Sequence, residues 1–229
     1  VIVCADADLA FVLKASLAAK YRNAGQVCAS PIRFYLPRAL CDAALQLIAE
    51  SGTASLTLSE VARRVGVSHA APYRHFADKT ALLTALATEG TNLLADAVAA
   101  ALKGAGGVPR ARFLDAGYAY VRFAVDNPAY FRVMFSGETN KEDPAALAAR
   151  DRSLGQLFAF VEDAKASGFF CGAATIDVVL PVFAMHQGLS ALAASGALGP
   201  LGFADLRAAS DVAHGSLLDG LGAKPRVAQ

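Results

Sequence analysis

Residues 58–83 read LSEVARRVGVSHAAPYRHFADKTALL, and this stretch decides the fold class. A capping box begins directly before it, because Thr57 is followed three positions later by Glu60. In a capping box the threonine hydroxyl and the glutamate carboxylate each accept a hydrogen bond from a free backbone amide at the helix start. The pattern predicts a short helix over residues 58–64.

A tight turn and a second short helix follow in the sequence. Gly66 suits the turn, and Ser68 can cap a helix over residues 69–76. Pro72 lies inside that helix, where it removes one backbone amide and predicts a bend. Two short helices joined by a tight turn are typical of a helix-turn-helix, whose second helix enters the major groove of DNA.

Basic residues gather in the same stretch. Residues 61–79 hold four basic side chains and one acidic side chain, Asp78, whereas the whole chain has a net charge of only +1. A near-neutral chain is not a uniformly basic nucleic-acid coat, but one local basic face is sufficient for DNA binding. The alternative is that these charges form an ordinary solvated face. The predicted DNA-binding residues are Thr57, Ser68, His69, Ala70, Tyr73, Arg74, His75 and Lys79.

Helices are also predicted for the rest of the chain after residue 37. The hydrophobic share of 55% and the charged share of 18% exclude a disordered chain, and 229 residues can bury a core. Apolar spacing, caps and breakers predict an all-α fold of about nine helices. They cover residues 38–51, 58–64, 69–76, 78–103, 110–126, a short helix from Asn127-Pro128, 143–167, 175–194 and 203–221.

Residues 118–135 are rich in aromatic side chains. Each of them singly fits a packed core, and together they could line a hydrophobic ligand cavity between helices. The predicted cavity residues are Tyr120, Phe123, Phe131, Met134, Phe158, Phe183 and His186. No catalytic or metal-binding constellation is predicted, and no cofactor is expected.

The stretch over residues 58–83, with RALCDAALQLIAESG before it, resembles the DNA-binding domain of the TetR family of bacterial transcriptional regulators. Tyr73-Arg74-His75-Phe76 followed by Asp78-Lys79 carries the resemblance, which covers residues 38–90. It implies that Ser68, His69 and Ala70 face bases and that Tyr73, His75 and Lys79 contact phosphates. It also implies a DNA-binding domain over residues 37–84 and an effector-binding and dimerisation domain over 85–229.

The C-terminal part resembles the regulatory domain of one TetR subgroup, through YVRFA and NPAYFRVMF and a later histidine–glycine pair at His186 and Gly188. The resemblance implies a homodimer formed by the last two helices. We expect a repressor that a small hydrophobic effector releases from palindromic, double-stranded operator DNA.

Residues 1–36 resemble a different family, the aldehyde dehydrogenases, around their catalytic cysteine. The motif Asn23-Ala24-Gly25-Gln26-Val27-Cys28 maps the nucleophile onto Cys28 and the oxyanion-binding asparagine onto Asn23. The nicotinamide domain and the general-base glutamate would lie before Val1, so we expect a non-catalytic extension and no enzyme activity. The alternative is a fragment of an NAD(P)-dependent aldehyde dehydrogenase with a reactive Cys28.

Cysteine spacing and hydropathy predict the compartment. The four cysteines form no CxxC pair, which disfavours a disulfide framework or zinc site and favours a reducing cytoplasm. Residues 178–204 lack charged side chains but contain prolines, glycines and polar groups. We therefore expect a buried or interface helix there, and no membrane partner.

Overall fold

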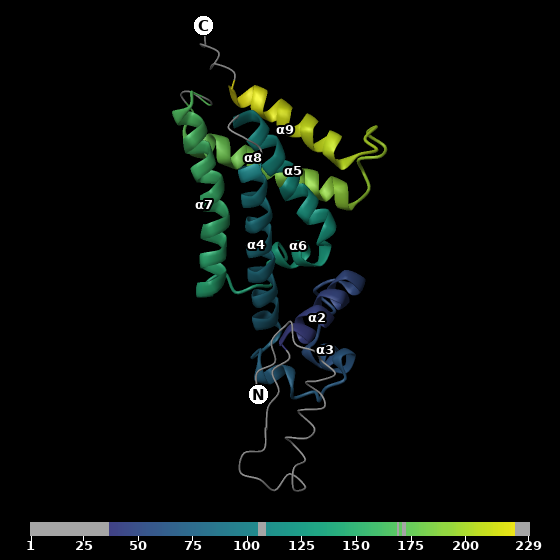
Figure 1. Cartoon of the computed structure of the whole chain (residues 1–229). Helices are drawn as coiled ribbons and strands as arrows, with labels where there is room; N and C mark the ends of the chain where they lie inside the picture. The colour runs from purple at the N-terminus through teal and green to yellow at the C-terminus, as the bar shows by residue number, and fades with distance from the viewer. Residues whose placement is uncertain (1–36, 105–108, 169, 171–172, 223–229) are drawn as a thin grey trace, which may run out of the picture. The chain divides into compact units, whose positions relative to one another are not determined.

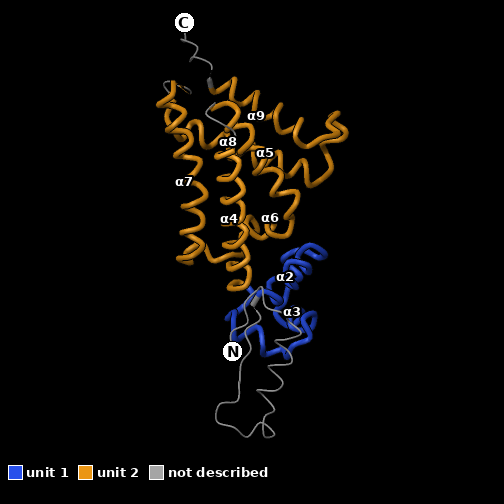
Figure 2. The backbone as a smooth tube through the Cα atoms, viewed as in Figure 1, with its two compact units in different colours: residues 1–79 blue, residues 80–229 orange. Residues whose placement is uncertain are grey.

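The computed structural model describes residues 37–104, 109–168, 170 and 173–222, and their regular structure is entirely helical (Figure 1). The helices are α2 (Pro37–Ser51), α3 (Leu58–Val65), the 3-10 helix η2 (Pro72–Arg74), α4 (Lys79–Gly104), α5 (Pro109–Asp126), α6 (Pro128–Met134), α7 (Pro144–Ala166), α8 (Thr175–Ala194) and α9 (Leu206–Gly222). The all-α prediction is confirmed. The chain divides into two compact units, residues 1–79 and 80–229 (Figure 2).

In the N-terminal unit, α2 packs against α3. The apolar stripe of α2 is buried as its spacing predicts, with Ala44 and Ile48 fully inaccessible to solvent. Val61 and Ala62 supply the matching buried face of α3. These small side chains let two short helices lie close together, which fixes α3 as a firm support for the turn that follows it.

Only half of the predicted capping box forms at the start of α3. The hydroxyl of Thr57 accepts a hydrogen bond from the backbone amide of Glu60 at 3.2 Å. The carboxylate of Glu60 does not accept a hydrogen bond from the backbone amide of Thr57. It accepts two from the guanidinium of Arg63 instead, at 2.6 and 2.8 Å. Gly66 ends α3 with φ +75°, a left-handed conformation that glycine adopts without steric cost.

The predicted helix over residues 69–76 is wrong. Regular structure there is limited to η2, flanked by turns in which the amide of Ala71 donates to Ser68 and that of His75 to Pro72. Proline is the physical reason, because Pro72 has no amide to donate to the carbonyl of Ser68 and its ring crowds the preceding turn. Instead of the predicted bent helix, residues 68–76 form a succession of tight turns around η2.

The C-terminal unit is built around α5, which packs against α6, α8 and α9, while α7 packs against α8 (Figure 1). Its main core cluster combines aromatic side chains from α5 and α7 with branched side chains from α8 and α9. The buried members are Phe113, Phe160, Val161, Ala164, Phe170, Val178, Val179, Val182 and Leu218.

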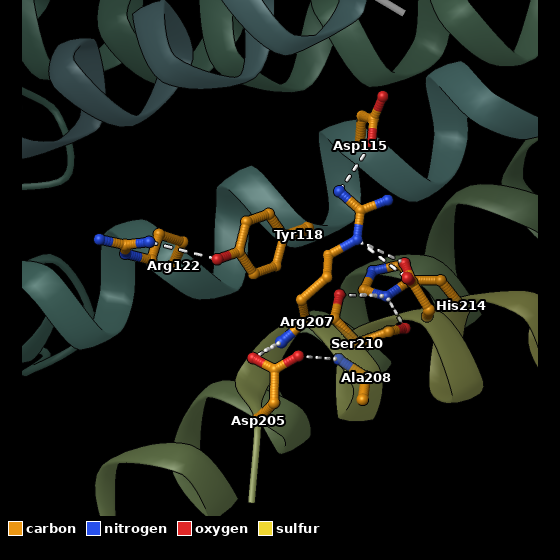
Figure 3. Close-up of polar contacts among 9 residues, drawn as sticks. Asp115, Tyr118, Arg122, Asp205, Arg207, Ala208, Ser210 and His214 are labelled. Carbon is orange, nitrogen blue, oxygen red and sulfur yellow. Dashed lines mark hydrogen bonds and ion pairs between the residues drawn. The ribbon is translucent and has the colours of Figure 1, made fainter.

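Polar contacts fix α9 against α5 (Figure 3). Arg207 pairs with Asp115 of α5 at 2.8 Å and with Asp211 of its own helix at 2.9 Å, and its guanidinium lies 5.0 Å from the ring centre of Tyr118. Two turns after Arg207 along α9, His214 is fully buried. Because the ion pairs of Arg207 are partly exposed, each contributes little stability, and their main effect is to set the orientation of α9 against α5.

Among the described helices, α8 has the length and mean hydropathy (1.4 over 18 residues) that a membrane span requires. Its interior holds Pro181, and its face toward the unit buries Val178, Val182 and His186. The sequence predicts a buried or interface helix, and α8 is buried on the face that carries Val178, Val182 and His186.

Candidate functional site

Five of the predicted DNA-binding residues lie exposed after the end of α3. Ser68, His69 and Ala70 follow the Gly66 turn and are exposed, and so is Arg74 within η2. Tyr73 is 55% exposed, although a side chain as large and aromatic as tyrosine usually contributes to packing. None of these side chains is needed for the core of the unit, so all five are accessible to a partner.

The other three predicted residues have structural contacts. Thr57 caps α3 through its hydroxyl. Lys79 is partly buried, and its ammonium group donates to the backbone carbonyl of Ala54 at 3.4 Å. His75 is also partly buried. Roles in DNA binding stay predictions for all eight residues.

The basic cluster is weaker than the sequence indicates. Arg63 pairs with Glu60 at 2.6 Å, and Arg64 pairs with Glu50 of α2 at 2.7 Å. Both acidic partners lie outside the window that defined the cluster. Arg74 has no ion pair within the described part of the chain, so it is the arginine of this surface whose charge remains uncompensated.

A cavity of about 450 Å³ lies inside the C-terminal unit. Its wall includes four of the seven predicted cavity residues, Tyr120, Met134, Phe183 and His186. Three predicted residues do not line it. Phe123 lines a separate groove on α4 and α5, Phe131 packs against Tyr120 and Phe135, and Phe158 is 39% exposed.

Two buried aromatic rings form the middle of the cavity wall. Tyr120 and His186 stack with ring centres 4.4 Å apart and an angle of 15° between the planes. The Tyr120 hydroxyl accepts a hydrogen bond from the side-chain amide of Gln187 at 2.9 Å. Burial raises the pKa of Tyr120, and burial beside His214 lowers the pKa of His186 to about 3, so both groups are neutral at physiological pH.

His186 also contacts a second buried histidine, because its ring centre lies 5.1 Å from that of His214 in α9. The Nδ1 atom of His214 lies 2.7 Å from the carbonyl oxygen of Ser210, which can only accept, so Nδ1 carries the proton. Nε2 of His186 and Nε2 of His214 have no hydrogen-bond partner among the described atoms. Gly117 of α5 makes room for the His214 ring.

Polar residues of the cavity were missed by sequence reasoning. The wall also contains Lys141, Arg150 and Gln156, together with Thr88 and Thr91. Arg150 shares one face of α7 with the other cavity residues of that helix, which are spaced three to four positions apart. In the sequence, however, a lone arginine in an alanine-rich helix is typical of a solvated side chain. Helical periodicity could have suggested it only after the apolar face of α7 was known.

No group of three or more His, Cys, Asp or Glu side chains that could hold a metal ion occurs among the described residues. Cys28 and Asn23 lie outside the described residues. Cys41, which the structure does describe, is partly buried.

Two family models match the chain. The model described as bacterial regulatory proteins, tetR family, matches residues 40–86, and the tetracyclin repressor-like C-terminal domain matches residues 113–214. A curated relative, the HTH-type transcriptional regulator BetI of Rhizobium meliloti (strain 1021), is 43% identical over 75 residues, or 33% of this chain and 36% of BetI. The match therefore spans about a third of that relative's length.

Solved structures resemble the chain over more of its length. A protein with unknown function from Rhodococcus sp. RHA1 superimposes with a TM-score of 0.71 at 32% identity, covering 84% of this chain and 98% of that one. FadR from Bacillus subtilis, in complex with stearoyl-CoA, superimposes with a TM-score of 0.65 at 16% identity, covering 80% and 98%. This second likeness concerns the fold alone.

The comparisons support the regulator and not the aldehyde dehydrogenase fragment. Neither family model reaches residues 1–36, so the resemblance of that segment stays a prediction. The two models together match 40–86 and 113–214, and both describe the same family of regulators. The chain therefore belongs to the tetR family of bacterial regulatory proteins, which are ligand-responsive, DNA-binding regulators of transcription.

Proposed function

We propose that the chain is a cytoplasmic repressor that binds palindromic operator DNA as a homodimer and releases it when an effector occupies the cavity. Residues 37–84 bind DNA, and residues 85–229 bind the effector and form the dimer. The observation that carries the proposal is the row of exposed polar residues after α3, which packing does not explain. A repressor of this kind has no catalytic step, so aldehyde and NAD should give no rise in the absorbance of reduced nicotinamide.

Exposed apolar side chains on α8 and α9 support the homodimer. Ile176 is 55% exposed, Leu180 62% and Val212 55%, in helices whose other face is buried. An apolar face of this kind is typical of a surface that a second copy covers. Light scattering should give the mass of a dimer, and a monomer at micromolar concentration would contradict this part of the proposal.

DNA binding is tested with an operator selected from a random-sequence library, by fluorescence anisotropy at several salt concentrations. His69→Ala should reduce the preference for the operator over random DNA, because His69 is assigned to base edges. Arg74→Ala and Lys79→Ala should weaken binding to both DNAs and lower the salt slope by about one, because we assign both side chains to phosphates.

Arg63→Ala is the matched control for Arg74→Ala. Both arginines are exposed and belong to the same unit, but Arg63 already pairs with Glu60. The control should leave the salt slope nearly unchanged. Equal losses for the two arginine variants would contradict the assignment of Arg74, and equal losses on operator and random DNA for His69→Ala would contradict that of His69.

The segment of residues 1–36 is proposed to be dispensable for DNA binding. The family match begins at residue 40, which supports a regulator that does not use the preceding segment. Deleting residues 1–36 should leave operator affinity unchanged in the same anisotropy measurement. Loss of operator binding by the shortened protein would refute the idea.

A further inference from the structure

We propose that the cavity binds an elongated amphipathic anion, with its charged group at Lys141 and Arg150 and its aliphatic chain directed toward Phe113 and Phe160. This inference rests on the proposed function in treating the cavity as the effector site. It replaces the general expectation of a small hydrophobic effector with a defined shape, charge and orientation.

The cavity is much longer than it is wide. Its wall on α4 runs from Ala87 to Leu102, which at 1.5 Å per residue is about 22 Å, and its wall on α7 runs from Ala146 to Phe160, about 21 Å. A spherical cavity of 450 Å³ would be only about 10 Å across. The space is therefore a partly open channel that follows two helices, and a chain-like ligand fits it better than a compact ring system.

Hydrogen bonds between the two helices fix the direction of this channel. Arg152 of α7 binds Asn92 and Asp96 in the middle of α4, and the amide of Asn140, just before α7, donates to the Thr84 hydroxyl near the start of α4 at 2.8 Å. The two helices thus run in the same direction, side by side (Figure 1). Residues early in both helices line one end of the channel, and residues late in both line the other.

The two ends differ in chemistry. The early end is lined by Thr88, Thr139, Asn140, Lys141 and Arg150, and the late end by Val98, Leu102, Phe113, Leu157 and Phe160. Lys141 and Arg150 are the charged residues of the wall, and both are basic. A ligand with an anionic group at one end and an apolar chain at the other matches this distribution of charge.

The two basic groups are available to a ligand. Lys141 is exposed and has no ion pair within the described part of the chain. Arg150 lies 3.2 Å from Asp151, but its side chain is 57% exposed, so water screens this pair and an incoming carboxylate can compete with it. Glu142 and Asp143 do not line the cavity, and the carboxylate of Asp143 caps α7.

The ligand class is tested by calorimetric titration of the full chain with decanoate, decanol and decylamine. Decanoate should bind at least about tenfold more tightly than decanol, because a charge-assisted hydrogen bond adds to the same apolar burial. Decylamine should bind most weakly. Longer carboxylates should gain about fourfold per methylene until the chain fills the channel. Equal affinity for decanoate and decanol, or tighter binding of decylamine, would overturn the proposal.

Variants locate the charged end. Arg150→Ala and Lys141→Ala should each weaken decanoate binding by about tenfold and leave decanol binding unchanged. Lys103→Ala is the control, because Lys103 is an exposed basic residue of α4 that does not line the cavity and has no hydrogen bond to α7 within the described part of the chain. An equal loss in the control, with circular dichroism showing that all three variants fold, would overturn the placement of the anion.

Two further measurements distinguish a free acid from a coenzyme A thioester, and the ligand class from the proposed repressor function. Decanoyl-coenzyme A would place its nucleotide outside the channel, and tighter binding than decanoate would identify the thioester rather than the free acid as the ligand form. If decanoate binds but operator DNA is not released in the anisotropy measurement, the proposed function fails and the ligand class stands. If none of these anions binds, the ligand class fails and DNA binding is unaffected.

Discussion

Replacing Gly117 with alanine is expected to destabilise the protein, although the same change usually stabilises a helix. Gly117 lies inside α5, and a methyl group added there would come within 2.0 Å of Nε2 and 2.1 Å of Cδ2 of His214. Carbon atoms in contact normally lie about 3.5–4.0 Å apart. The imidazole ring would therefore have to move by about 1.5 Å, given that contact distance.

The surroundings of His214 allow little movement. The ring is fully buried, its centre lies 5.7 Å from that of Phe113 and 5.1 Å from that of His186, and its Nδ1 binds the Ser210 carbonyl. Overpacking of this kind costs about 1–3 kcal/mol. Losing the hydrogen bond would add about 1 kcal/mol, and the better helix propensity of alanine would return about 1 kcal/mol.

The net effect is thus a loss of about 1–3 kcal/mol in the free energy of unfolding, given the terms above. For a chain of this size the melting temperature should fall by roughly 2–12 °C. Thermal unfolding followed by circular dichroism measures this change. Gly155→Ala is the control, because Gly155 lies inside α7 with no atom near an added methyl group, and it should gain up to about 1 kcal/mol.

A double-mutant cycle decides whether the clash is the cause. His214→Ala removes the ring, so Gly117→Ala in that background should be harmless and the two losses should not add. The expected coupling free energy is at least about 1 kcal/mol. Gly117→Ala as stabilising as Gly155→Ala, or two losses that add fully, would refute the argument.

Two further predictions concern titration and backbone strain. His186 has its pKa lowered to about 3 in the folded chain, whereas an unfolded histidine binds a proton near pH 6.5. The unfolded state therefore holds more protons between these values, and stability falls by up to about 1.4 kcal/mol per pH unit as the pH drops through this window. His186→Phe keeps the stack on Tyr120 and should flatten the pH dependence of urea unfolding between pH 6 and 4; an unchanged slope would contradict it. Gly66→Ala places a side chain at φ +75° with no atom within 4 Å, so about 1–2 kcal/mol of purely conformational strain should lower the urea midpoint, and an unshifted midpoint would refute this.

Local patterns predicted most of the helices, because caps, breakers and apolar spacing act within a few residues. Thr57 caps α3 as predicted, and α7 begins at the predicted Asp143-Pro144 pair, where the carboxylate of Asp143 caps it. The failure at residues 69–76 has a local cause as well. Pro72 lacks the amide that a second full helix needs. The sequence alone does not show whether this loss outweighs the helix propensity of the neighbouring residues.

The candidate site was harder to predict, because distant segments build it. Aromatic density indicated the right part of the chain, but spacing alone does not say which face of a helix meets the cavity. Phe123 and Tyr120 lie three positions apart on α5, yet only Tyr120 lines the channel. The charged end was missed because Lys141 and Arg150 become neighbours of the cavity only when α7 packs beside α4.

The channel and α9 meet at the same few side chains of α5 and α8. Gly117, Tyr120 and His186 line the channel, while the far side of Gly117 and His186 contacts His214 of α9. His214 is fully buried, so a ring of this stack that is pushed away from the channel meets closely packed atoms on that side. A ligand that pushed the Tyr120–His186 pair toward α9 would therefore also press on His214. Because a ligand acts on an equilibrium only through contacts that differ between two states, an effector of the proposed kind would act on α9 through this pair of histidines only if it shifted the Tyr120–His186 stack.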